Sequence, residues 1–184
     1  MSPQRQSHDP LDRELLDKTR QIKLLVLDVD GVLSDGRLYF SNGGEEIKNF
    51  HIQDGLGIKL LARGGVETAI ITGRSSQIVA RRAEQLGVRH VMQGREDKLV
   101  ALQELCQALT LDLHEVAYMG DDLPDLAPIR RVGVGLTVAN ANAVVREHAG
   151  WISQFNGGDG AVREACEFIL DTQGKLSALI DEYL

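Results

Sequence analysis

Apolar residues occur along the chain in short continuous runs, and these runs alternate with stretches of helical periodicity. Continuous apolar runs bounded by glycine or aspartate are typical of strands that are buried on both faces of a sheet. The runs predict strands at 23–29, 66–71, 88–92, 116–119, 132–136 and 151–153. The intervening pattern predicts helices at 10–21, 55–63, 75–86, 96–108, 123–130, 142–148 and 161–172, and a shorter helix from 175 to the end.

One segment departs from this alternation. Two extended segments, 37–40 and 45–50, flank Ser41-Asn42-Gly43-Gly44, and Asn-Gly between extended segments is a strong hairpin signal. The other strands alternate with helices, so we expect an α/β fold with a doubly wound parallel sheet, Rossmann-like, and a β-hairpin inserted after the first strand. Residues 1–9 are expected to be disordered, and 10–184 to form a single domain in which 157–184 is a C-terminal tail and helix.

The composition of the chain argues against several classes of function. The chain has 184 residues, 43% of them hydrophobic, a net charge of −7 and a pI of about 5.2. This acidic balance argues against general affinity for nucleic acid or for anionic membrane surfaces. The polar start is unlike a secretory signal and no apolar run would span a bilayer, so we expect a cytoplasmic protein. Cys106 and Cys166 match no metal spacing and are expected to be buried, reduced thiols.

Carboxylates cluster where predicted strands end. Asp28 and Asp30 close the first strand, and Asp121, Asp122 and Asp125 follow a later one. Ligands of doubly wound sheets bind at the carboxyl ends of the strands, so these groups should share one crevice. Mg²⁺ prefers such oxygen ligands.

The first acidic segment has two other interpretations. An EF-hand loop starting at Asp28 would place Val32 and Leu33 where an oxygen ligand and a glycine are required, so a calcium loop of that type is excluded. An aspartate-rich turn is the simpler interpretation of the segment taken alone.

Further residues fit phosphate chemistry. Thr72 offers a hydroxyl and a backbone N–H beside Gly73, which suits an anion, although a threonine at a strand end also commonly caps the next helix. Lys98 lies at a predicted helix start, where the helix dipole disfavours a cation. A lysine there could serve a phosphate, although surface lysines are frequent and the position alone does not decide between the two. Arg74 and Arg82 lie about two helical turns apart and are expected to share a face, which could equally be a solvated basic face.

Taken together, these motifs resemble those of the haloacid dehalogenase-like phosphatases. The resemblance rests on four motifs in the family's order: Asp28-Val29-Asp30-Gly31-Val32-Leu33, Ile70-Ile71-Thr72-Gly73-Arg74, Lys98, and Gly120-Asp121-Asp122-Leu123-Pro124-Asp125. Each motif alone is weak to moderate, whereas the ordered set is specific.

The resemblance implies a two-step phosphoryl transfer. Asp28 would be the nucleophile that forms an aspartyl phosphate, and Asp30 the general acid and then the general base. Mg²⁺ would be held by Asp28, the backbone carbonyl of Asp30, and Asp121. Thr72 and Lys98 would bind the phosphoryl oxygens. Of the remaining acidic residues, 122 and 125 would orient the metal shell.

A narrower resemblance, to the 3-deoxy-D-manno-octulosonate 8-phosphate phosphatase family, covers nearly the whole chain beyond residue 10. It implies a capless homotetramer of lipopolysaccharide synthesis with a small anionic sugar-phosphate substrate, in which the segment after Gly157-Gly158 reaches a neighbour's active site. The substrate contacts that it implies are Asp30, His51, Ile52, Gln53, Asp54, Gly55, Lys59, Arg74, Arg82 and Lys98.

This sequence departs from that family's pattern at three positions. Lys59 stands where arginine is common, His51 where asparagine is more usual, and Asp159 where the tail often carries a basic residue. None of these residues belongs to the four motifs, so the departures concern substrate recognition. Two alternatives stay open: the same chemistry on a nine-carbon keto-sugar acid 9-phosphate or another small sugar phosphate, and a non-catalytic binding module with the same fold.

Overall fold

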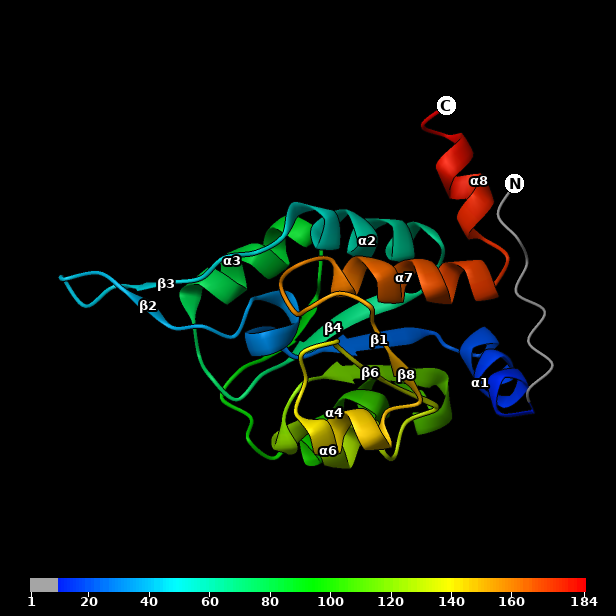
Figure 1. Cartoon of the computed structure of the whole chain (residues 1–184), viewed down its shortest axis with the longest axis horizontal. Coiled ribbons are helices and arrows are strands. Elements are labelled where there is room, and N and C mark those ends of the chain that lie inside the picture. Colours follow the sequence, from blue (N-terminus) through cyan, green and yellow to red (C-terminus); the bar gives the residue numbers. More distant parts are fainter. Residues whose placement is uncertain (1–9) are drawn as a thin grey trace.

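The computed structural model describes residues 10–184, with side chains described from Arg13 onward, and it contains a six-stranded parallel sheet (Figure 1). The disorder expected for 1–9 lies outside the described residues. The strand order is β5-β4-β1-β6-β7-β8. The strands are β1 (Leu24–Leu27), β4 (Glu67–Ile71), β5 (His90–Met92), β6 (Val116–Gly120), β7 (Val134–Thr137) and β8 (Trp151–Ile152).

The central strand, β1, shows why its sequence is continuously apolar. Leu24 and Val26 pack into the core on one face of the sheet, and Leu25 and Leu27 pack into the core on the other face. All four side chains are fully buried. β1 pairs with β4 on one side and β6 on the other, so the chain reverses its winding direction at β1. The carboxyl end of β1 is therefore the switch point at which ligands bind in such sheets.

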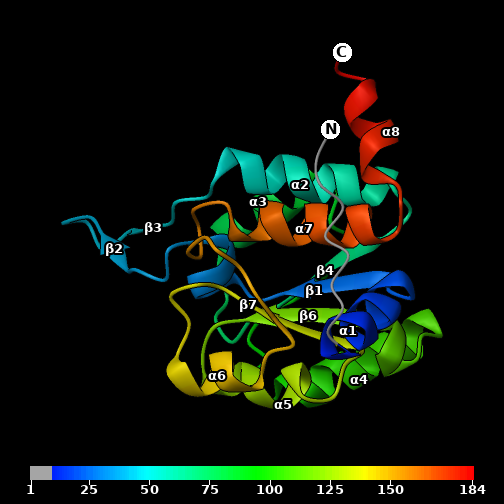
Figure 2. The same ribbon diagram turned by 45° about the vertical axis from the view of Figure 1, so that its right-hand side comes forward.

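Helices cover both faces of the sheet, which confirms the doubly wound α/β fold (Figures 1 and 2). The face in which Leu25 and Leu27 lie is covered by α2 (Ile52–Arg63), α3 (Gln77–Leu86) and α7 (Ala161–Thr172). The opposite face is covered by α4 (Lys98–Leu109), α5 (Leu126–Ile129) and α6 (Ala143–His148). Two further helices, α1 (Pro10–Arg20) and α8 (Leu176–Asp181), contact α7.

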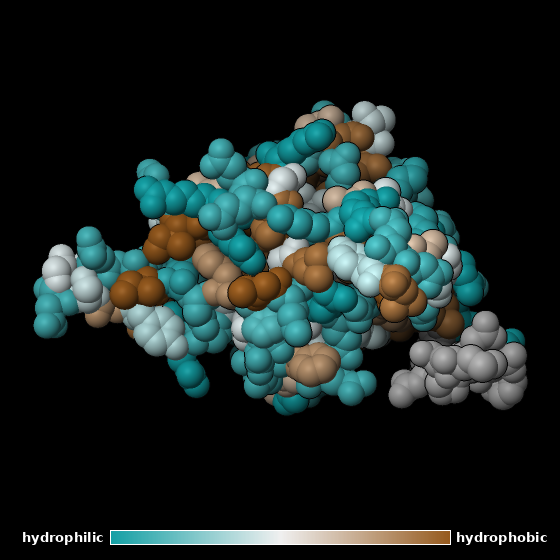
Figure 3. Space-filling view, turned by 90° about the horizontal axis from the view of Figure 1, so that it is seen from above, coloured by the Kyte–Doolittle hydropathy of each residue, from teal (hydrophilic) through white to brown (hydrophobic). Residues whose placement is uncertain are grey.

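The predicted hairpin forms a separate two-stranded antiparallel sheet of β2 (Tyr39–Phe40) and β3 (Glu46–Ile47), which projects away from the main sheet (Figure 1). Its apolar side chains are exposed: Phe40 is 62% exposed and Ile47 55%. Figure 3 shows brown apolar surface on this projecting part of the molecule. An isolated hairpin is marginally stable in water, so this one requires further contacts to hold its shape.

The element boundaries differ from the predicted ones where tertiary contacts decide them. Helix α2 begins at Ile52, three residues before the predicted start, and its first turn contains Asp54. Asp54 is buried and accepts a hydrogen bond from the backbone N–H of Arg163, at 2.8 Å, at the start of α7. The sequence pattern does not reveal this contact between two helices. Among the described residues, no helix combines the length and the apolar character needed to cross a membrane.

Candidate active site

A cleft of about 730 Å³ opens at the carboxyl ends of β1, β4 and β6. Most of the motif residues identified in the sequence line it. The lining residues are Asp28, Asp30, Gly36, Thr72, Gly73, Arg74, Glu96, Lys98, Asp121, Asp122, Pro124 and Asp125. The topology therefore brings the four motifs together, as predicted from the strand-end rule.

The loop after β1 brings the first motif against the fourth. The backbone N–H of Asp28 donates to the carbonyl of Met119 at 3.0 Å, which extends the pairing of β1 with β6 by one residue. The chain then makes a tight turn over Val29–Leu33 (η1), where Gly31 has a φ of 90°. A Cβ at Gly31 would lie 2.1 Å from Oδ2 of Asp121. Glycine is therefore required for the Asp121 carboxylate to pack beside this loop.

A buried lysine links the nucleophile candidate to the acidic motif. Lys98, the first residue of α4, places its Nζ 2.8 Å from Oδ2 of Asp28 and 2.6 Å from Oδ1 of Asp125. All three side chains are almost fully buried. Burial alone would lower the pKa of Lys98, but the two carboxylates outweigh burial and raise it. The ammonium therefore stays charged and fixes one oxygen of Asp28.

Asp125 is fully occupied by protein hydrogen bonds. Its Oδ1 accepts from Lys98 and from the hydroxyl of Tyr118, the latter at 2.7 Å. Its Oδ2 accepts from the backbone N–H groups of Asp121 and Asp122, at 3.2 and 3.3 Å. A carboxylate has about four lone-pair sites, so Asp125 has none left for a metal. These contacts hold Lys98 and the loop after β6 in place.

The carboxylate cluster suits a divalent cation, with Asp28 and Asp121 as the candidate ligands. Oxygens of Asp28, Asp121 and Asp125 lie within 4.8 Å of one another. Burial, reinforced by the charge of Asp125, raises the pKa of Asp28 to about 6 despite the opposing effect of Lys98. Burial and the charges of Asp28 and Asp125 raise the pKa of Asp121 to about 7. Both carboxylates are thus desolvated and also repelled by neighbouring carboxylates, and a divalent cation would offset that repulsion.

Thr72 and Arg74 follow β4 and complete the cleft. Thr72 is buried, and its backbone N–H donates to the carbonyl of Met92 at 3.0 Å. The prediction that this N–H serves an anion is therefore wrong, and only the hydroxyl can do so. Arg74 is about half exposed and donates to Oε1 of Glu46 at 3.2 Å.

The other predicted substrate contacts lie outside the cleft lining. Arg82, on α3, donates to the carbonyl of His51 at 3.5 Å and lies over the ring of Phe50, with 5.8 Å from Cζ to the ring centroid. Lys59 is exposed on α2. Arg74 precedes α3, so it does not share a helix face with Arg82, contrary to the prediction. The residues outside the lining are His51, Ile52, Gln53, Asp54, Gly55, Lys59 and Arg82.

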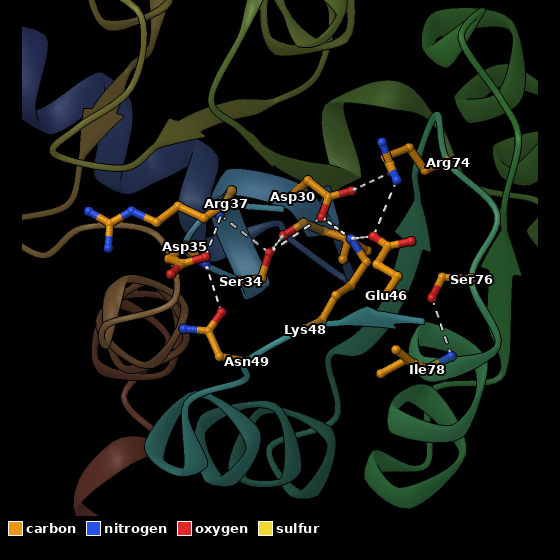
Figure 4. A network of polar contacts seen from close by, with 12 residues as sticks. Asp30, Ser34, Asp35, Arg37, Glu46, Lys48, Asn49, Arg74, Ser76 and Ile78 are labelled. Carbon is orange, nitrogen blue, oxygen red and sulfur yellow. Dashed lines mark hydrogen bonds and ion pairs between the residues drawn. The ribbon is translucent and has the colours of Figure 1, made fainter. Parts of the chain in front are cut away.

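Sequence reasoning did not single out Gly36 and Glu96, which line the cleft, or Tyr118, Glu46 and Lys48, which contact residues that line it. Tyr118, which bonds Asp125, lies inside the apolar run of β6, where a tyrosine looks like an ordinary core residue. Glu46 and Lys48 belong to the hairpin, whose charges look solvent-exposed in the sequence. In the structure the Lys48 side chain is only 1% exposed and contacts Asp30 (Figure 4). No periodicity in the sequence could have indicated that contact.

A doubly wound sheet with two aspartates after β1, a threonine after β4, a lysine at the start of α4 and an acidic loop after β6 defines a haloacid dehalogenase-like phosphatase. In agreement, the profile of the haloacid dehalogenase-like hydrolases matches residues 85–164. The chain belongs to the 3-deoxy-D-manno-octulosonate 8-phosphate phosphatase family. It is 43% identical to that phosphatase of Escherichia coli strain K12 over 169 residues, which cover 92% of this chain and 90% of the relative.

Solved structures agree with this assignment. The 3-deoxy-D-manno-octulosonate 8-phosphate phosphatase of Moraxella catarrhalis, crystallised with magnesium, phosphate and the octulosonate, is 46% identical with a TM-score of 0.92. The match covers 94% of this chain and 99% of that one. The cobalt-bound phosphatase of Haemophilus influenzae is 38% identical with a TM-score of 0.84, covering 88% and 94% of the two chains.

Proposed function

We propose that this chain hydrolyses 3-deoxy-D-manno-octulosonate 8-phosphate to 3-deoxy-D-manno-octulosonate and phosphate, with Mg²⁺ as cofactor, in the cytoplasmic synthesis of lipopolysaccharide precursors. The observation that carries the proposal is the arrangement of buried Asp28 and Lys98 beside the half-buried Asp121 in the cleft. The arrangement combines a fixed carboxylate nucleophile, a cation beside it and a cluster with excess negative charge. The relatives described above supply the substrate class.

The first step is the transfer of the phosphoryl group to Asp28. Lys98 holds Oδ2 of Asp28, and a carboxylate oxygen of Asp28 attacks phosphorus as the bond to the sugar oxygen breaks. Asp30 donates its proton to the departing alkoxide. In the second step Asp30 removes a proton from water, the water oxygen attacks phosphorus, and the Asp28 carboxylate is released with inorganic phosphate.

Asp28 and Asp121 would hold the cation together with the backbone carbonyl of Asp30. When bound there, Mg²⁺ offsets the charges of the carboxylates and the phosphate, which would otherwise repel one another. The hydroxyl of Thr72 and the ammonium of Lys98 bind phosphoryl oxygens, and both groups are already in the cleft lining. Lys98 thus serves both the nucleophile and the phosphoryl group.

Recognition of the sugar acid uses a cluster that one chain does not bring to its own cleft. Asp30, Arg74 and Lys98 line the cleft, whereas the other proposed contacts, at 51–55, 59 and 82, lie outside it. We assign them to the cleft of a neighbouring subunit in a homotetramer. The exposed apolar hairpin, including Phe40 and Ile47, supports assembly. Sedimentation velocity at micromolar concentration tests this assignment, and a monomer would contradict it.

The glycine-rich segment before α7 contacts its own subunit's catalytic loop. The backbone N–H of Gly158 donates to the carbonyl of Val32 at 2.8 Å, and a Cβ on Gly157 would lie 1.7 Å from the carbonyl oxygen of Gly31. Any reach of the C-terminal segment into a neighbouring site therefore begins beyond these glycines. The nearby Asp159 is exposed, so its charge can be met by water.

The test is phosphate release with Mg²⁺ from the octulosonate 8-phosphate and from a nine-carbon keto-sugar acid 9-phosphate. Asp28→Asn serves as the inactive reference and Asp171→Asn, on the exposed face of α7, as the matched control. We expect kcat/KM to be about a hundredfold higher for the octulosonate, which corresponds to ~2.7 kcal/mol of discrimination in the transition state. Equal values would retain the phosphatase and reject the substrate. No release from either would support a non-catalytic module.

A further inference from the structure

Lys48 is the most deeply buried charged side chain of the hairpin segment. It follows β3, where the chain returns from the hairpin toward α2, and only 1% of its side chain is exposed. Its Nζ donates to Oδ1 of Asp30 and lies 3.0 Å from Oε1 of Glu46 (Figure 4). The hairpin segment thus places the ammonium group of Lys48 against Asp30, the residue proposed as the general acid and base.

Burying a lysine is costly unless its charge is met by nearby carboxylates, and ordering its long side chain costs additional entropy. Lys48 meets two carboxylates, from the catalytic loop and from its own hairpin, so its ammonium has a fixed position. A lysine that only neutralised surface charge would gain little from such burial. The burial of Lys48 against Asp30 therefore indicates that this lysine holds the Asp30 carboxylate in place.

The two oxygens of Asp30 have different surroundings. Oδ1 accepts from Lys48 and, at 3.5 Å, from the hydroxyl of Ser34. Oδ2 lies 3.9 Å from Nε of Arg74, which is beyond hydrogen-bond distance, and among the described residues it accepts no hydrogen bond. Because Lys48 holds Oδ1, the carboxylate is oriented and Oδ2 remains available to exchange a proton with substrate or water.

Glu46 connects Lys48 to Arg74. Its Oε1 lies 3.0 Å from Nζ of Lys48 and 3.2 Å from Nη2 of Arg74. The hydrogen bond from Lys48 lowers the pKa of Glu46, and Arg74 acts in the same direction. Two carboxylates and two cations therefore alternate in a row, which joins the hairpin to the cleft-lining arginine (Figure 4).

We propose that Lys48 is a positioning residue that holds Asp30 in the orientation required for proton transfer, with Glu46 fixing Lys48. This inference rests on the proposed phosphatase function. Its chemical consequence depends on the leaving group. A sugar alkoxide is a poor leaving group and needs the proton from Asp30, whereas p-nitrophenolate leaves without one. A purely structural role for Lys48 would affect both substrates equally.

The experiment compares wild type, Lys48→Met and Glu46→Gln on the octulosonate 8-phosphate and on p-nitrophenyl phosphate, with Lys175→Met as the matched control. The ratio kcat/KM reports formation of the aspartyl phosphate. For Lys48→Met we expect it to fall about 100-fold on the sugar phosphate and to stay within about threefold on the aryl phosphate. Hydrolysis of the aspartyl phosphate also needs Asp30, so a burst of p-nitrophenolate should appear.

An equal loss on both substrates, or no loss on either, would overturn the proposal. If circular dichroism shows that Lys48→Met does not fold, Glu46→Gln decides the question, because it leaves the lysine in place. This variant should also lose more kcat/KM on the sugar phosphate than on the aryl phosphate, but by a smaller factor. If the wild-type enzyme does not hydrolyse the octulosonate 8-phosphate, that result contradicts the proposed substrate and not the role of Lys48. The same comparison is then made with whichever alkyl phosphate the enzyme hydrolyses.

Discussion

Magnesium binding to this chain should release protons at mildly acidic pH, because the two carboxylates proposed as ligands bind protons unusually tightly in the metal-free protein. Burial and neighbouring charges raise the pKa of Asp28 to about 6 and that of Asp121 to about 7. A metal ligand must be deprotonated, so protons and Mg²⁺ compete for the same oxygens. Lowering the pH from 8 to 6 is therefore a direct perturbation of the site.

The size of the effect follows from these two pKa values. If the interaction between the two groups is neglected, roughly 90% of molecules carry both negative charges at pH 8, against roughly 5% at pH 6. The affinity for Mg²⁺ should therefore fall about 20-fold between these pH values. Binding at pH 6 should release about 1.4 protons per ion, and binding at pH 8 about 0.1.

Isothermal titration calorimetry in buffers of different ionisation enthalpy measures both quantities without substrate. Asp121→Asn removes the group with the higher pKa, so proton release at pH 6 should fall to about 0.5 and Mg²⁺ should bind more weakly. Asp171→Asn changes an exposed aspartate of α7 in the same way and should behave as wild type. An affinity that is unchanged between pH 6 and 8, with no proton release, would refute the reasoning.

Three further predictions concern the stability of the protein and its affinity for Mg²⁺. Without metal, the free energy of unfolding of Asp121→Asn in urea should rise relative to that of wild type between pH 5 and 8. The reason is that the raised pKa of Asp121 in the native state makes its ionisation favour the unfolded state. A difference that stays constant with pH would contradict this. Gly31→Ala should weaken Mg²⁺ binding more than about tenfold in calorimetry, since its Cβ would displace Asp121, whereas Gly43→Ala, in the open hairpin turn, should not; equal binding by both would be the adverse result. Asp125→Asn should lower the unfolding free energy by about 3 kcal/mol, because Lys98 loses a buried partner, and a melting temperature equal to that of wild type would argue against that role.

Much of the fold could be predicted from the sequence because local pattern and topology agree. The apolar run that became β1 is buried on both faces, as its composition requires, and alternation with helices fixes a parallel sheet. The start of α2 could not be placed, because Asp54 enters the helix to contact the backbone of Arg163, which is distant in sequence. Contacts of this kind have no local signal.

In the candidate site, too, some features could be predicted from the sequence and others could not. Asp28, Thr72, Lys98 and Asp121 could be placed together because each follows a strand or starts a helix at the same edge of the sheet. The role of Asp125 as the partner of Lys98 and Tyr118, rather than as a metal ligand, depends on hydrogen-bond geometry that spacing does not contain.

The central claim is that Asp28 becomes phosphorylated during turnover. The most direct test is rapid quenching of the enzyme with Mg²⁺ and the octulosonate 8-phosphate, followed by mass spectrometry of the peptide that contains Asp28. The account predicts that this peptide gains the mass of one phosphoryl group during turnover, and that Asp28→Asn shows neither the adduct nor phosphate release. Turnover without an adduct, together with full activity of Asp28→Asn, would contradict it.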